Sequence, residues 1–289
     1  MYKITGHTRL TGLLGSPVAH SISPLMHNEA FQLLNLDYVY LCFDVSEDSL
    51  ETAVNGLKAC NIRGFNLTMP NKNKVVELLD ELSPAARLIG AVNTVVNDNG
   101  RLIGYNTDGI GYMQSVKDAG YDIKGKTVTL MGAGGAATAI CAQAALDGVS
   151  VIHIFARPTS RFWERTCTLV NTINETLPCR AILHENGDTA ALKDALLQSA
   201  MLINATSVGM APNTDASIIT DTSLFRPDLI VSDVIYNPRE TKLLYEAKQA
   251  GSPVFNGMYM LLYQGAEAFR LWTGQQMPIE PVKAKYFPK

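Results

Sequence analysis

The sequence predicts an α/β fold built from two domains. Short apolar segments alternate with amphipathic ones from end to end, which is the pattern of βαβ units. Near the middle of the chain, a glycine-rich turn joins an apolar segment to an alanine-rich one, as at the first crossover of a doubly wound sheet. The length of 289 residues suits two domains or one large one.

In the first half of the chain, we expect strands where short apolar segments end at turn residues, and helices where apolar residues repeat on one face. Pro24 suits the first turn of a helix, and the Asn-Asp-Asn-Gly turn at 97–100 favours the positive φ of a hairpin. The expected strands cover residues 10–15, 38–45, 64–69, 91–97 and 101–105, and the expected helices cover 24–35, 48–60, 71–82 and 108–119.

The second half contains the glycine turn and a further alternation of strands and helices. The expected strands cover residues 126–131, 149–155, 201–205, 229–235 and 253–255, and the expected helices cover 136–146, 258–273 and 280–286, with a helix, a strand and a helix between 156 and 199. We therefore expect an N-terminal α/β domain of residues 1–106, completed by final helices at 256–289. Residues 107–255 are expected to form a Rossmann-type doubly wound domain.

Composition argues against several classes of partner. The 24 basic and 27 acidic residues give a net charge of −3, without the basic block of a nucleic-acid binder. No apolar run approaches the roughly 18 residues of a membrane span. The five cysteines and five histidines form no C-x-x-C pair and no zinc-like spacing, so we expect no metal site. The cysteines are expected to be reduced, mostly buried thiols of a cytoplasmic protein.

The glycine turn predicts a dinucleotide site. Gly132, Gly134 and Ala137 match G-x-G-x-x-[GA] directly after an expected strand. The first glycine permits a tight turn, and the second lets a pyrophosphate approach backbone N–H groups at a helix start. The alternative is a tight turn that binds nothing. The expected contacts are Gly132, Ala133, Gly134, Gly135 and Ala136.

Polar side chains gather near the expected strand ends of the first domain, where α/β sheets bind ligands. Their hydroxyl, amide, ammonium and carboxylate groups suit a small polyhydroxylated acid, although ordinary capping of helices and turns is the alternative for each one. Lys72 is the strongest candidate, because the dipole of the helix expected at 71–82 disfavours a cation at its start. The set is Ser21, Ser23, Thr68, Lys72, Asn93 and Asp108.

Eight motifs together resemble the shikimate dehydrogenase family, including its quinate/shikimate dehydrogenase branch, over nearly the whole chain. They are S-x-S-P at 21–24, N-L-T-M-P-N-K at 66–72, G-A-V-N-T at 90–94, Y-N-T-D-G at 105–109, G-A-G-G-A at 132–136, N-A-T-S-V-G-M at 204–210, Y-N-P at 236–238 and L-L-Y-Q-G-A at 261–266.

The resemblance implies reversible, NAD(P)-dependent oxidation of shikimate to 3-dehydroshikimate, a step of chorismate and aromatic amino acid biosynthesis. Carried over by position, it implies that the substrate carboxylate binds the two serines, and that Tyr236 lies near substrate and nicotinamide. Thr206 and Gly257 are further implied cofactor contacts. The implied ring-hydroxyl contacts are Thr68, Asn93, Asp108 and Gln264.

Lys72 is the implied catalytic acid/base, and Asp108 is assigned as its orienter and as an acceptor for a substrate hydroxyl. A free lysine has a pKa of about 10.4, which is high for a base at neutral pH. Burial lowers such a pKa and a nearby carboxylate raises it, so the sequence leaves the owner of the proton within this pair open.

Cofactor preference depends on the segment after the strand expected at 149–155. A carboxylate there selects NAD, but none occurs before Glu164, whereas Arg157 and Arg161 could flank the 2′-phosphate of NADP. The family's N-R-T-x-x-x-R run is matched at both arginines but not at Ala156 or Pro158. We expect NADP to be favoured and NAD usable. The alternative is that both arginines are solvated surface charges.

Three functional alternatives remain open at this stage. Quinate carries one more hydroxyl than shikimate, and we expect the Thr68 methyl to crowd it and make shikimate the better substrate. Another cyclitol acid, such as an aminoshikimate, is the second alternative. A non-catalytic sensor that binds a dinucleotide and a shikimate-like ligand is the third. Monomer and homodimer are both compatible with the sequence.

Overall fold

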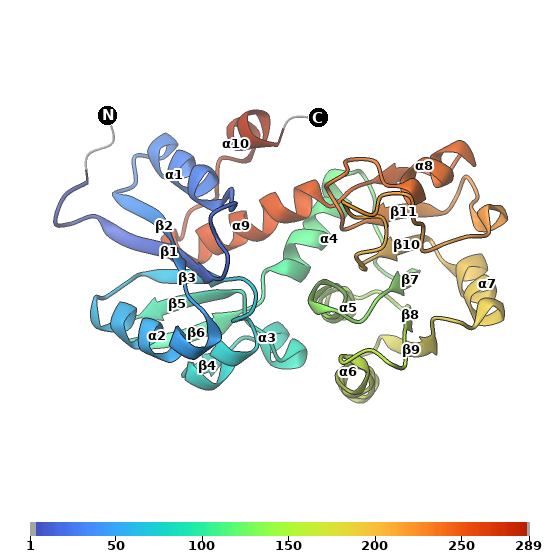
Figure 1. Ribbon diagram of the computed structural model, residues 1–289, viewed down its shortest axis with the longest axis horizontal. Helices are drawn as coiled ribbons and strands as arrows, with labels where there is room; N and C mark the ends of the chain where they lie inside the picture. The colour runs from blue at the N-terminus through green and yellow to red at the C-terminus, as the bar shows by residue number, and fades with distance from the viewer. Residues whose placement is uncertain (1–3, 288–289) are drawn as a thin grey trace. The chain divides into compact units, whose positions relative to one another are not determined.

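The structure, a computed structural model, describes residues 4–287 and divides into two compact units. The first unit comprises Met1–Thr107 and Leu262–Lys289, and the second comprises Asp108–Leu261. Figure 1 shows a layered α/β arrangement in each unit, which confirms the predicted fold class. The chain re-enters the first unit inside helix α9 (Met258–Thr273), rather than at the expected residue 256.

The first unit is built on a six-stranded sheet of order β2-β1-β3-β5-β6-β4. Strand β5 runs antiparallel to both of its neighbours, and the other strand pairs are parallel. The start of β5 therefore lies at the same edge as the ends of β1, β3 and β6. The strands are β1 (Arg9–Gly15), β2 (Tyr38–Asp44), β3 (Gly64–Leu67), β4 (Glu81–Leu82), β5 (Thr94–Asp98) and β6 (Arg101–Tyr105).

Helices cover both faces of this sheet (Figure 1). Apolar residues of α2 (Leu50–Ala59) and α3 (Pro84–Ile89) pack on one face in a core that includes Phe65 and Val95. On the other face, aromatic rings of α1 (Ser23–Leu33) and α9 pack against those of β2. Helix α10 (Ile279–Tyr286) contacts α1.

The prediction of a helix over residues 71–82 is wrong. A short 3-10 helix occupies Lys74–Leu78, and β4 follows it as an edge strand beside β6. The carboxylate of Asp80 accepts the N–H of Leu102 at 2.7 Å, so contacts with a distant strand override the local helical pattern. The following helix α3 was not anticipated, although Ser83 and Pro84 at its start and Gly90 at its end are ordinary helix signals.

The second unit is a Rossmann-type fold, as expected. Its six strands are all parallel and have the order β12-β11-β10-β7-β8-β9, the doubly wound arrangement. The strands are β7 (Thr127–Met131), β8 (Val151–Ala156), β9 (Arg180–Glu185), β10 (Met201–Asn204), β11 (Ile230–Asp233) and β12 (Val254–Phe255).

Two layers of helices enclose this parallel sheet. The helices α7 and α8 share one core with residues of β7, β8, β10 and β11. The helices α4 and α5 contact each other, and α5 also contacts α6. The elements are α4 (Asp108–Asp118), α5 (Gly135–Leu146), α6 (Trp163–Thr176), α7 (Thr189–Gln198) and α8 (Lys242–Gln249), of which α8 was not anticipated.

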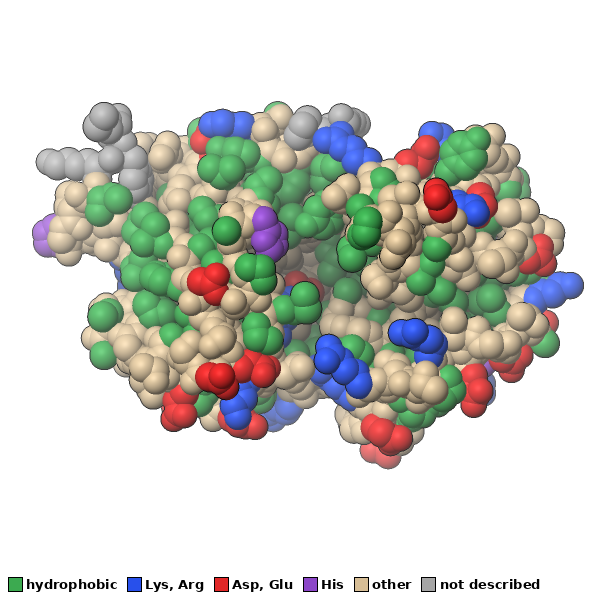
Figure 2. Space-filling view, viewed as in Figure 1, with side chains coloured by type: hydrophobic (Ala, Val, Ile, Leu, Met, Phe, Trp, Pro, Cys, Tyr) green, Lys and Arg blue, Asp and Glu red, His purple; other side chains and the backbone are tan. Residues whose placement is uncertain are grey.

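The surface carries charges of both signs (Figure 2), and the cysteines carry free thiols. In Figure 2, acidic and basic side chains are interspersed on the visible face. Among residues 4–287, no helix is long and apolar enough to cross a membrane, and no group of three or more His, Cys, Asp or Glu could hold a metal ion. All five cysteines are free, but only Cys141 and Cys179 are buried and Cys60 is exposed, so the expectation of mostly buried thiols is wrong.

Candidate active site

Most of the polar residues singled out in the sequence occur at one edge of the first unit's sheet. Ser21 and Ser23 follow β1, Thr68 and Lys72 follow β3, and Asn93 precedes the antiparallel β5. Asp108 begins α4, shortly after the end of β6. The reversal of β5 is therefore what brings Asn93 to the edge where its parallel neighbours end.

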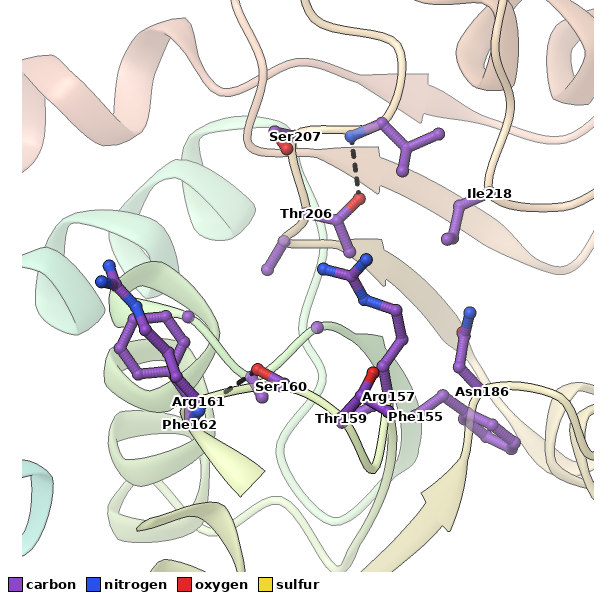
Figure 3. A pocket seen from close by; sticks show the side chains of 16 residues that line it. Phe155, Arg157, Thr159, Ser160, Arg161, Phe162, Asn186, Thr206, Ser207 and Ile218 are labelled. Carbon is purple, nitrogen blue, oxygen red and sulfur yellow. Dashed lines mark hydrogen bonds between the residues drawn. The ribbon is translucent and has the colours of Figure 1, made fainter. Parts of the chain in front are cut away.

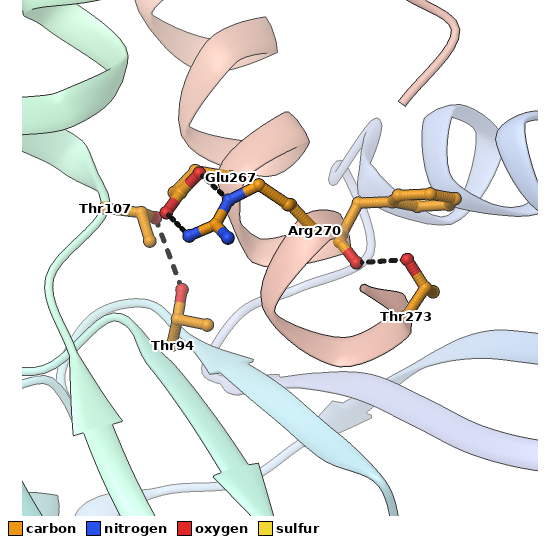
Figure 4. A network of polar contacts seen from close by, with 6 residues as sticks. Thr94, Thr107, Glu267, Arg270 and Thr273 are labelled. Carbon is orange, nitrogen blue, oxygen red and sulfur yellow. Dashed lines mark hydrogen bonds and ion pairs between the residues drawn. The ribbon is translucent and has the colours of Figure 1, made fainter. Parts of the chain in front are cut away.

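Asn93 is the centre of a buried hydrogen-bond network at this edge. Its Oδ1 accepts the backbone N–H of Thr107 at 2.8 Å and the hydroxyl of Thr94 at 3.0 Å. Its Nδ2 lies 3.5 Å from Oε1 of Gln264, so two of the implied hydroxyl contacts meet here. Figure 4 shows the hydroxyls of Thr94 and Thr107 facing each other, 3.3 Å apart.

Gln264 reaches this network because the last turns of α9 are fixed to the sheet. The Nε of Arg63 donates to the carbonyl of Trp272 at 2.8 Å, and the indole N–H of Trp272 donates to the carbonyl of Val95 at 3.0 Å. On the same helix, Arg270 forms two hydrogen bonds with the carboxylate of Glu267 (Figure 4).

The two serines lie at the start of α1, but Ser23 does not cap that helix. Ile22 is the N-cap residue and makes no side-chain cap hydrogen bond, so the capping alternative for Ser23 is wrong. The Oγ of Ser21 accepts the backbone N–H of Ser23 at 3.2 Å, which holds the two residues together. Ser23 is buried and Ser21 is half-buried.

Lys72 is held in a tight turn between β3 and the 3-10 helix. The amide of the buried Asn71 donates to the carbonyl of Val45 at 2.8 Å, and the carbonyl of Lys72 accepts the N–H of Val92 at 2.8 Å. Because the expected helix is absent, the helix-dipole argument for Lys72 does not apply. Lys72 and Asp108 are both half-buried.

The second unit contains a cavity of about 600 Å³ at the glycine turn (Figure 3). Among the described residues, its lining includes six of the nine expected cofactor contacts: Gly132, Ala133, Gly134, Arg157, Arg161 and Thr206. Gly135, Ala136 and Gly257 do not line it. At Gly257, a Cβ would overlap the carbonyl of Val234, so close backbone packing explains that glycine.

The glycine turn has the geometry that its sequence predicts. Gly132 has a φ of +119°, and a Cβ on it would lie 2.8 Å from the carbonyl oxygen of Ala205. Gly134 is the N-cap residue of α5, and a Cβ there would meet nothing within 4 Å. The open space beside Gly134 therefore leaves the N-terminus of α5 accessible to an anion.

The two arginines enter the cavity differently. In Figure 3, the Arg157 side chain extends across the cavity toward Thr206. Arg161 lies over the ring of Phe162, with its guanidinium carbon 4.7 Å from the ring centroid. The hydroxyl of Ser160 accepts the N–H of Phe162 at 3.2 Å, and this bond stabilises the loop between the two arginines.

Comparisons with known proteins point to one family. Residues 13–95 match the family model described as shikimate dehydrogenase substrate binding domain, and residues 257–285 match the one described as shikimate 5'-dehydrogenase C-terminal domain. A relative from Listeria monocytogenes serotype 4b (strain F2365), named shikimate dehydrogenase (NADP(+)), is 50% identical over 285 residues, or 99% of this chain and 98% of its own. The chain belongs to the shikimate dehydrogenase family.

Solved structures of related dehydrogenases also match this chain. Shikimate 5-dehydrogenase from Listeria monocytogenes, in complex with shikimate and NAD, has a TM-score of 0.95 and 50% identity, with 98% of each chain covered. Quinate dehydrogenase from Corynebacterium glutamicum, in complex with NAD, has a TM-score of 0.83 and 29% identity, covering 96% of this chain and 98% of its own. The resemblance carried by the eight motifs is thus confirmed.

In this member of the shikimate dehydrogenase family, two buried residues, Tyr40 and Asn66, support the Asn93 network through Thr94. The hydroxyl of the fully buried Tyr40 donates to Oδ1 of Asn66 at 2.8 Å. The amide of Asn66 donates to the hydroxyl of Thr94 at 2.9 Å. Burial raises the pKa of Tyr40 well above its usual value, so its hydroxyl keeps its proton and acts as the donor. Sequence reasoning assigned no role to either residue.

A second buried group supports the cavity at the glycine turn. The carboxylate of Asp233, which is not exposed at all, accepts hydrogen bonds from the N–H of Ile235, the amide of Asn204 and the hydroxyl of Thr241 at 2.9, 3.1 and 2.8 Å. Oδ1 of Asn204 then accepts the hydroxyl of Thr206 at 2.7 Å. Burial raises the pKa of Asp233, although the three donors favour the ionised form.

Tyr236 does not line the cavity, whereas several residues that do line it were not expected. Tyr236 follows β11 in the second unit and is 51% exposed. Several residues that line the cavity were not anticipated, among them Asn186, Ser207, Val208 and Ile218. Asn186 could have been found, because it directly follows β9, and the ends of neighbouring parallel strands share one edge.

Proposed function

We propose that this chain catalyses the reversible oxidation of shikimate to 3-dehydroshikimate, with NADP as the favoured acceptor and NAD as a usable one. Support comes from the polar edge of the first unit, where hydroxyl, amide and ammonium groups come from separate elements and two of the residues, Asn93 and Gln264, are in contact. This donor and acceptor set complements a ring that carries one carboxylate and three hydroxyls. The close relatives carry the same function in their names.

Each polar residue of the first unit has a role in this proposal. Ser21 and Ser23 bind the substrate carboxylate at the start of α1, where backbone N–H groups also favour an anion. Thr68, Asn93 and Gln264 bind ring hydroxyls. These contacts fix the orientation of the ring.

Proton transfer is assigned to Lys72. Its neutral amine takes the proton from the hydroxyl that is oxidised, and the ammonium that results returns the proton in the reverse direction. Asp108 accepts a hydrogen bond from the same region of the ring and orients the lysine. Tyr236, which follows β11, is assigned to substrate and nicotinamide by the family resemblance alone.

The dinucleotide is assigned to the cavity of the second unit, whose residues fit it. The open N-terminus of α5 beside Gly134 suits a pyrophosphate, and Thr206 presents a hydroxyl fixed by Asn204. Arg157 lines the same cavity and is assigned to the 2′-phosphate, and no carboxylate lines the cavity among the described residues. When bound, the nicotinamide supplies the hydride acceptor.

The setting of this activity is also part of the proposal. We expect the enzyme to act in the cytoplasm, because all five cysteines are free. Its partners are then its two small-molecule ligands, without nucleic acid or membrane. Whether one or two copies form the working enzyme is decided by size-exclusion chromatography with light scattering.

Absorbance at 340 nm tests the proposed function directly. Purified enzyme is mixed with shikimate or quinate and with NADP or NAD, in all four combinations. We expect the highest kcat/KM for shikimate with NADP. A higher value for quinate would support the quinate alternative, for which the quinate dehydrogenase neighbour is the structural precedent. No reduction with any pair would contradict the proposal and favour the sensor.

A further inference from the structure

We infer that Gly15 is a positioning residue for Thr68, because it leaves a notch that holds the threonine methyl and thereby aims the threonine hydroxyl at the substrate. A Cβ placed on Gly15 would overlap the Cγ2 methyl of Thr68. The methyl therefore occupies the space that any other residue at position 15 would fill. The inference rests on the proposed function, in which Thr68 contacts the substrate.

The backbone on both sides of this notch is fixed. Gly15 ends β1 and Thr68 follows β3, and these strands pair in parallel, with Leu14 opposite Leu67. The N–H of Thr68 donates to the carbonyl of Leu14 at 3.0 Å, and the N–H of Ser16 donates to the carbonyl of Met69 at 3.0 Å. Neither residue can move away without breaking these bonds.

The notch selects one side-chain conformation. A threonine side chain adopts one of three staggered conformations about its Cα–Cβ bond. Each conformation points the methyl and the hydroxyl in different directions. With the methyl of Thr68 packed over Gly15, its hydroxyl has a single remaining direction. A serine at position 68 would lose this constraint, because its hydroxyl could rotate into the notch.

Gly15 is required here for its missing side chain rather than for its backbone. Its φ lies outside the left-handed region that favours glycine, whereas Gly132 lies inside it. An alanine at position 15 is therefore compatible with the local backbone and differs only by the methyl that enters the notch. The carbonyl of Met69, 3.0 Å from that methyl, adds a smaller contact.

The packing of the Thr68 methyl on Gly15 changes the expected reason for a preference for shikimate over quinate. The sequence suggested that the Thr68 methyl crowds the extra hydroxyl of quinate. In the structure the methyl packs against Gly15, so it does not project freely into the space beside the ring. Any preference for shikimate then depends on the direction of the Thr68 hydroxyl.

A methyl exchange tests the inference. Four enzymes are compared with shikimate at saturating NADP: the unmodified chain, Gly15→Ala, Thr68→Ser and the double variant. In the double variant, the methyl introduced at position 15 fills the notch that the threonine methyl has vacated, and again excludes the hydroxyl at position 68 from the notch. We expect Gly15→Ala to raise KM for shikimate about tenfold and Thr68→Ser to raise it about threefold, because three staggered positions replace one. The double variant should lie within about twofold of the unmodified enzyme.

The outcomes separate this inference from a merely structural role. Losses that multiply in the double variant, or a Thr68→Ser enzyme with an unchanged KM, would overturn it. If Gly15→Ala does not fold, Thr68→Ser still decides, because it keeps the hydroxyl and frees only its rotation. If the unmodified chain does not oxidise shikimate, the proposed function fails instead. In that case melting temperatures test the notch. Gly15→Ala should lower the melting temperature, and adding Thr68→Ser in the double variant should restore it.

Discussion

The ring of His27 stacks on the ring of Tyr40, with centroids 4.5 Å apart and planes 11° from parallel. Both side chains are fully buried, and Trp272 of α9 packs against both rings. Within residues 4–287, neither ring nitrogen of His27 has a hydrogen-bond partner. Burial accordingly lowers the pKa of His27 from 6.5 to about 3. An uncharged histidine is thus enclosed against the ring of Tyr40, the donor of the Tyr40–Asn66 pair.

This burial predicts a loss of stability in acid. Below pH 6.5 the unfolded chain binds a proton on His27 that the folded chain excludes, so stability falls as the pH drops from 6.5 toward 3. Between pH 7.5 and 5, this residue alone should cost about 2 kcal/mol. His27→Phe should remove that part of the pH dependence, as measured by urea unfolding at the two pH values. The exposed His7 provides the control, His7→Phe, and equal slopes for both variants would contradict the prediction.

Lys72→Ala tests the proton-transfer assignment. We expect kcat for shikimate oxidation to fall by about 10²–10⁴, with a smaller change in KM, because the lysine acts mainly in the transition state. Lys74→Ala is a matched control, since Lys74 is exposed and pairs with Glu77 at 3.3 Å. Near-normal turnover of the Lys72 variant in steady-state kinetics would exclude this residue as the acid/base.

Arg157→Ala tests the 2′-phosphate assignment. Removing the guanidinium should raise KM for NADP by about tenfold or more and change KM for NAD by less than about threefold, because only NADP carries the extra charge. Arg180→Ala is the control, since Arg180 is exposed at the start of β9 and does not line the cavity. An equal loss for both dinucleotides would show that Arg157 does not distinguish them.

Asp233→Asn tests the support of the dinucleotide cavity. Three donors point at the Asp233 carboxylate, so an amide would place its own N–H groups against at least one of them and loosen Asn204 and Thr206. We expect dinucleotide affinity, measured by calorimetric titration, to fall about tenfold while the variant remains folded. Asp228→Asn, at an exposed ion pair with Arg226, should leave the affinity unchanged.

The sequence was informative wherever structure follows from neighbours along the chain. The glycine turn, the hairpin turn at Asn99 and Gly100, and the alternation of strands and helices all follow local rules, and the structure confirms them. The helix expected at 71–82 failed because β4 pairs with β6, a contact that local pattern does not contain.

The supporting residues of both sites were missed for the same reason. Tyr40 reads as an ordinary strand residue until sheet order places β2 and β3 on either side of β1. Asp233 likewise acquires its role from Asn204 on the neighbouring strand, 29 positions earlier. Such partners are set by the order of strands in a sheet, which one sequence does not state.

The division of the first unit has a consequence for its synthesis. A ribosome makes β1 at the outset and α9 near the end, with all of Asp108–Leu261 made in between. Until α9 emerges, the rings of Phe31 and Tyr40 lack Phe269 and Trp272 as neighbours. The unit that begins first is therefore finished last, and in the interval its open aromatic face is a natural target for chaperones.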